Sequence, residues 1–89
     1  MKEIVLNGAL WQNEKDMHAD LAQALSFPSY YGANFDALHD CLTELDEVSL
    51  VIEGCTKAQE TLGRRWQIAM RVFWDSVNEN DRLQVTLRE

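Results

Sequence analysis

The chain has 89 residues, a formal net charge of −7 and a pI near 4.6. Its length favours one domain, residues 1–89, and its 46% hydrophobic residues, including three tryptophans, argue against disorder. The acidic charge disfavours direct binding to nucleic acid or to an anionic membrane, so a basic protein is the expected partner.

The sequence predicts a strand and then a helix near the start of the chain. Ile4-Val5-Leu6 is a short apolar run that ends at Asn7-Gly8, which is typical of a buried strand followed by a turn. Asn13 is placed to cap a helix from about Glu14 to Leu25, with Asp16 in its first turn, where a carboxylate suits the helix dipole. Because nothing before the strand reads as a signal peptide and no apolar run is long enough for a membrane span, we expect a cytoplasmic protein.

A loop and a second helix follow. Phe27 to Gly32 interrupts the helical pattern, because it holds the only proline and a glycine. Within this loop we expect one of the two tyrosines, Tyr30 and Tyr31, to cover the edge of the core. Asn34 is a second cap, and apolar spacing predicts a helix from about Asn34 to Glu44. The apolar residues of that helix are Phe35, Leu38, Leu42 and Leu45.

The second half predicts a strand, two helices and a final strand. Leu50 to Ile52 is a buried strand, and a short helix over Thr56 to Leu62 precedes a longer one over Arg64 to Val77. A polar turn over Asn78 to Asp81 leads into Leu83 to Leu87, which alternates like a strand with one buried face. Because helices separate the strands, the order indicates an α/β fold with a small, mainly parallel three-stranded sheet packed by helices.

Few residues are candidates for catalysis or metal binding. Cys41 and Cys55 lack a metal-ligand spacing and are expected to be buried free thiols, and acidic neighbours raise the pKa of the Cys41 thiol. Asp36, His39 and Asp40 together are the best candidates for a small metal-dependent hydrolase. Since the chain has only two histidines, we expect no metal site, no cofactor and no enzyme.

Acidic residues are segregated along the chain. Asp36 and Asp40 are four residues apart on the predicted helix, and Thr43 and Glu44 continue the same side. Like charges at this spacing cost about 0.2–0.5 kcal/mol per pair, so helix stability does not require them. The stripe is therefore either a solvated surface or a binding face. No lysine or arginine lies between Lys15 and Lys57, a stretch that holds Asp16, Asp20, Asp36, Asp40, Glu44, Asp46, Glu47 and Glu53.

The same residues resemble the barstar family, the intracellular inhibitors of barnase-type ribonucleases. The resemblance covers essentially the whole chain and implies a three-stranded parallel sheet with helices. It also implies that the second helix and the loop before it form the inhibitory face of a monomer. Its most specific part is the run Pro28-x-Tyr30-Tyr31-Gly32-x-Asn34-x-Asp36-Ala37-Leu38-x-Asp40-Cys41-Leu42-Thr43.

The resemblance implies a role for each matching residue. Asp40 would enter the phosphate-binding centre of a basic ribonuclease and stand in for the charge of an RNA phosphate. A barstar-like module that binds a different basic protein is the main alternative. The full predicted partner-binding set is Tyr30, Asn34, Asp36, His39, Asp40, Thr43, Glu44 and Asp75.

The chain departs from the family pattern at several of these positions. His39 stands where a tryptophan is usual, and Glu44-Leu45 replaces a Gly-Trp pair at the end of the helix. Asp75 is one methylene shorter than the usual glutamate, and Asp81 stands where a cysteine that pairs with Cys41 is expected. These changes affect the target and the affinity rather than the fold.

Overall fold

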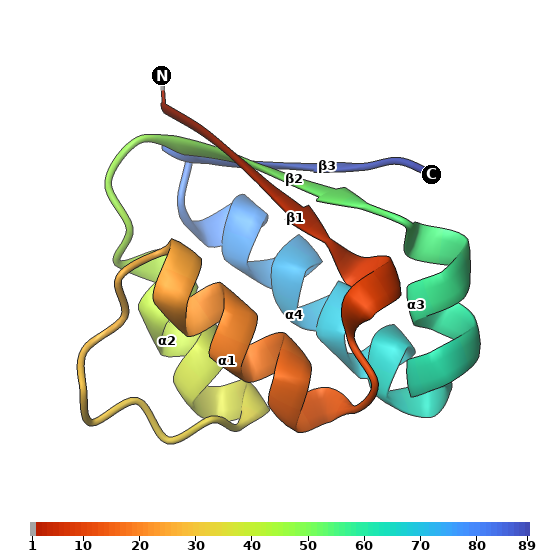
Figure 1. Cartoon of the computed structure of the whole chain (residues 1–89). Coiled ribbons are helices and arrows are strands. Elements are labelled where there is room, and N and C mark those ends of the chain that lie inside the picture. The colour runs from red at the N-terminus through yellow and green to blue at the C-terminus, as the bar shows by residue number, and fades with distance from the viewer. Residues whose placement is uncertain (1) are drawn as a thin grey trace.

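The computed structural model describes residues 2–89 (Figure 1). Its three strands form one parallel sheet in the order β1-β2-β3, which confirms the predicted α/β fold. The elements in chain order are β1 (Lys2–Asn7), a short 3-10 helix η1 (Gly8–Leu10), α1 (Glu14–Ala24), α2 (Phe35–Thr43), β2 (Val48–Glu53), α3 (Cys55–Leu62), α4 (Arg64–Glu79) and β3 (Leu83–Leu87).

The helices lie on one face of the sheet (Figure 1). The register pairs Ile4 with Leu50 and Leu50 with Val85, so these three apolar residues, one from each strand, point to the same side of the sheet. Leu50 is fully buried beneath the helices, whereas Val5, on the opposite face, is 48% exposed. The structure is therefore a two-layer arrangement whose core lies between the sheet and the helices.

The apolar sides of the helices form this core. α2 packs against α4, and α4 packs against β3. Ile68 and Val72 on α4 are half-buried and widen the apolar side of this helix. The buried helix residues that meet in the core are Met17, Leu21, Leu38, Leu42, Trp66, Ala69 and Phe73.

Several boundaries differ from the sequence prediction. Asn7-Gly8 is not a simple turn, because the Asn7 side chain accepts a hydrogen bond from the Ala9 N–H at 3.0 Å and begins η1. The helix predicted to end at Val77 continues to Glu79, so the predicted polar turn is wrong in its first half. The first two strands extend beyond their apolar runs, because the backbone N–H and C=O groups of the polar residues at their ends also pair in the ladder.

Both cysteines are free thiols, but the prediction that they are buried is wrong. Cys41 and Cys55 are half-buried. Burial raises the pKa of the Cys41 thiol, and the charges of Glu44 and Asp40 raise it further, as the acidic surroundings predicted. Burial also raises the pKa of the Cys55 thiol, whose Sγ donates to the carbonyl of Ile52. Both side chains are therefore thiols rather than thiolates near neutral pH.

Gly54 supplies a prediction about stability. It begins α3 in the left-handed conformation, with φ 67°, and a Cβ there would lie 2.8 Å from the Ala9 Cβ and 2.9 Å from the Ala9 nitrogen. We expect Gly54→Ala to lower the free energy of unfolding by more than about 1–2 kcal/mol, because crowding adds to the strain of the left-handed backbone. Urea denaturation measures the change.

A double variant separates the two causes. In an Ala9→Gly background one of the crowding atoms is gone, so Gly54→Ala should cost less than it does in the natural sequence. Equal costs in the two backgrounds would show that crowding against the Ala9 Cβ does not contribute to the loss.

Candidate protein-binding face

Helix α2 is fixed on the protein by its capped start and its apolar side. The Asn34 side chain accepts a hydrogen bond from the Ala37 N–H at 2.8 Å, which confirms the predicted N-cap. Leu38 and Leu42 are fully buried beneath the helix. Because these contacts fix the rotation of α2, its polar side faces outward. Asp36 lies in the first turn of that polar side and is exposed.

The carboxylate of Asp40 lies free on this outward side. Its side chain is 81% exposed, and the nearest cation partner is the His39 ring, whose Nδ1 lies 3.9 Å from Asp40 Oδ1. No hydrogen bond to the Asp40 carboxylate occurs within residues 2–89. Glu44 follows one turn later as the exposed C-cap residue. The arrangement therefore presents carboxylates that an incoming cation reaches without breaking an internal bond.

Thr43 differs from its acidic neighbours. Its hydroxyl donates to the backbone carbonyls of His39 and Asp40, both at 3.0 Å. The residue is half-buried. Because its hydroxyl proton is donated within the helix, the hydroxyl oxygen can only accept a further hydrogen bond. A partner would therefore find an acceptor at Thr43.

The two tyrosines of the loop have different environments. Tyr30 is 86% exposed, whereas Tyr31 is half-buried and stacks in a tilted arrangement on Phe27, with 4.9 Å between ring centroids. This confirms that one of the two tyrosines covers the edge of the core. The other, Tyr30, presents its ring to solvent beside α2.

A chain of polar contacts through the buried His18 holds the loop in place. Burial raises the pKa of the Tyr31 hydroxyl, and Cys41 and Glu14 raise it further, so the hydroxyl keeps its proton. It is hydrogen-bonded to His18 Nδ1 at 2.6 Å. The opposite ring nitrogen of the buried His18 then donates to Glu14 at 2.9 Å, and Glu14 lies 3.5 Å from Arg65. The loop before α2 is thus tied to α1 and α4.

A hollow of about 320 Å³ lies between this loop and α2. The hollow combines an exposed aromatic ring with two carboxylates, which suits a basic side chain. Its lining residues are Pro28, Tyr30, Tyr31, Gly32, Ala37, Asp40, Cys41 and Glu44.

Helix α4 adds a second acidic edge to the face. His39 on α2 bonds to Glu79 on α4, with 2.5 Å between Nε2 and Oε2. The predicted residue Asp75 is exposed on the same helix. The predicted binding face does not include Glu79, because the sequence predicts that the helix ends at Val77. Asn78 and Glu79 are both compatible with a helix, and Asn80, which is the C-cap, was the signal for the later end. We name Asp36, Asp40, Glu44, Asp75 and Glu79 the acidic face.

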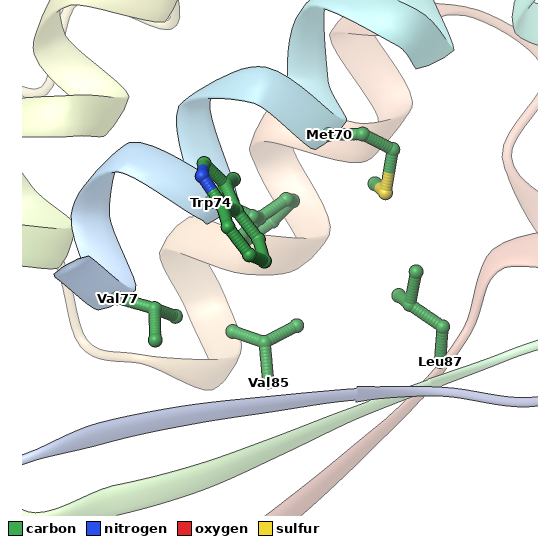
Figure 2. Close-up of a pocket in the computed structure, with 6 residues that line it drawn as sticks. Met70, Trp74, Val77, Val85 and Leu87 are labelled. Carbon is green, nitrogen blue, oxygen red and sulfur yellow. The ribbon is translucent and has the colours of Figure 1, made fainter.

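A separate apolar hollow of about 290 Å³ lies between α4 and β3 (Figure 2). It shares no lining residue with the hollow beside α2. Trp74 lines this hollow and is 68% exposed. Its lining residues are Met70, Phe73, Trp74, Val77, Val85 and Leu87.

Within residues 2–89 no group of three or more His, Cys, Asp and Glu side chains is placed to hold a metal ion, so Asp36, His39 and Asp40 do not form one. No helix in the same range is long and apolar enough to cross a membrane.

The fold and the acidic face define a class of protein: a small α/β protein with a two-layer core and a negatively charged surface helix. The chain belongs to the Barstar (barnase inhibitor) family, whose model matches residues 1–88. It is also similar to "Putative ribonuclease inhibitor YrdF" of Bacillus subtilis (strain 168), with 42% identity over 52 residues. That match covers 58% of this chain and 57% of the relative, so it spans little more than half the length of either protein.

Proposed function

We propose that this chain inhibits a barnase-type ribonuclease by covering the cationic active site with α2 and the loop before it. Membership of the Barstar (barnase inhibitor) family and the similarity to YrdF support an inhibitory role. The protein needs no catalytic group for this function, because it acts by occupying the site, as a monomer inside the cell.

The observation that carries the proposal is the free carboxylate of Asp40. A ribonuclease concentrates arginine, lysine and histidine where it holds the phosphate of RNA. A carboxylate that is 81% exposed and has no internal hydrogen bond among the described residues can accept charge-assisted hydrogen bonds from those cations. Asp40 is therefore the residue we assign to the position of an RNA phosphate.

The remaining predicted residues surround Asp40 on one side of the molecule. Asp36 and Glu44 lie one turn to either side along α2, and Asp75 adds charge from α4. Tyr30 and Asn34 border the helix start, where an exposed ring and a polar side chain suit the edge of a protein interface. Net charge of −7 also favours encounter with a basic enzyme.

An RNA-cleavage assay tests the proposal. We expect an equimolar amount of this chain to abolish cleavage by a barnase-type ribonuclease, with inhibition that weakens at high salt because the contacts are ionic. The matched control is a structurally unrelated acidic protein of similar size and charge. Unchanged cleavage, together with binding to a basic protein that is not a nuclease, would support the alternative of a barstar-like interaction module.

A further inference from the structure

The acidic face contains one side chain that can carry positive charge close to Asp40. His39 is 33% exposed, bonds through Nε2 to Glu79 on α4, and places Nδ1 3.9 Å from the Asp40 carboxylate. The charge of Asp75 on α4 also raises the pKa of His39. A cation at this point offsets part of the negative charge that the acidic face presents to a partner.

We infer that His39, positioned by Glu79, releases its proton when the acidic face binds a cationic partner, so that binding strengthens as pH rises. The inference rests on the proposed function and adds a regulatory property to it. Glu79 is a positioning residue here. It bonds to Nε2 of the His39 ring and so holds the opposite side of the ring beside Asp40.

The surroundings of His39 favour its charged form in the free protein. The hydrogen bond to Glu79 is the main cause that raises the pKa of His39 above its ordinary value of 6.5, partly opposed by slight desolvation. The charges of Glu79, Asp40 and Asp75 raise this pKa further. All three groups that act on the ring by their charge are carboxylates, so they favour the protonated form of His39.

A bound partner reverses part of this effect. Arginine, lysine or histidine side chains of the partner would pair with the Asp40 carboxylate, whose charge would then favour protonation of His39 less. They would also place positive charges beside the ring. The pKa of His39 is therefore lower in the complex than in the free protein. Between the two pKa values binding releases a proton, so affinity rises with pH, by at most about tenfold per pH unit for one proton.

Folding and binding then depend on pH in opposite directions. A histidine whose pKa is raised by folding adds stability that is fully present below pH 6.5 and is lost as pH rises through the higher, folded-state pKa. Stability should therefore fall in the same window in which affinity rises. A general loss of structure would lower both quantities together.

Calorimetric titration of a barnase-type ribonuclease with the full chain tests the inference between about pH 6 and about pH 8. We expect the affinity of the natural chain to rise about three- to tenfold more over this range than that of His39→Asn. Glu79→Gln should shift the rise to lower pH, because the bond that favours the protonated ring is weaker. Glu60→Gln, which removes the same charge from the exposed surface of α3, is the matched control and should leave the profile unchanged.

The possible results separate this inference from the proposed function. A pH profile of His39→Asn parallel to that of the natural chain would overturn the inference and leave the ribonuclease assignment intact, because the remaining dependence would belong to the enzyme. Absence of binding at every pH would overturn the proposed function and this inference with it. Urea denaturation of each variant over the same pH range confirms folding and measures the opposing dependence of stability.

Discussion

Replacing Asp40 by alanine is expected to weaken binding to a barnase-type ribonuclease by at least about 2 kcal/mol, or roughly thirtyfold in the dissociation constant. The carboxylate has no structural partner to lose, since it is 81% exposed and lies 3.9 Å from its nearest charged neighbour, His39. The loss would therefore come from the interface, where the cations of the enzyme remain without the charge that stood in for phosphate. Calorimetry or inhibition of RNA cleavage measures it.

Two further variants define what the aspartate contributes. Asp40→Asn keeps the size of the side chain and removes its charge, so a loss close to that of alanine would assign the effect to charge. Glu60→Ala removes an exposed carboxylate from α3 and should change affinity by less than about 0.5 kcal/mol. If Asp40→Ala had no larger effect than Glu60→Ala, Asp40 would not be central to the interface.

Replacing Asn80 by alanine is expected to lower the free energy of unfolding by about 2–4 kcal/mol. Asn80 is 5% exposed, and its amide donates to the carbonyls of Leu42 and Leu45, both at 3.0 Å. Its side-chain oxygen accepts from the N–H of Arg82 at 3.1 Å. One side chain thus satisfies two carbonyls, one in the last turn of α2 and one just after it, and the backbone N–H of Arg82. Alanine would leave all three without this partner.

Asn78 offers the matched control for this variant. It lies two residues earlier on α4 and is exposed, so Asn78→Ala should change stability by less than about 0.5 kcal/mol. Asn80→Asp keeps the acceptor for Arg82 and loses both amide donors, so most of the destabilisation should persist. Urea denaturation curves with equal slopes allow the free energies of unfolding to be compared. Equal stability of the Asn78→Ala and Asn80→Ala variants would contradict the prediction.

The sequence predicts α2 and the acidic face well because both follow from local spacing. Leu38 and Leu42 are four residues apart and buried, and Asp36 and Asp40 have the same spacing on the opposite side. A helix with a capped start then has only one rotation that buries the apolar side. The exposure of Asp40 therefore follows from its place in the sequence.

Other features could not be predicted because they depend on pairs that are distant in the chain. Asn80 looks like a turn residue, and only the end of α2 makes it a buried hydrogen-bond donor. His18 is buried because Tyr31 and Glu14 satisfy both ring nitrogens, which its own neighbours in sequence do not reveal in full. The bond between His39 and Glu79 likewise requires the packing of α2 on α4.

The parallel sheet also determines how this chain must fold. Ile4 pairs with Leu50, and Leu50 pairs with Val85, so each strand pairing closes a long segment that contains two α-helices. Closing such segments costs chain entropy before any strand contact forms, which slows folding relative to proteins built from hairpins. The capped helices form from local contacts, so we expect them to be organised first and the sheet to be completed in the last cooperative step.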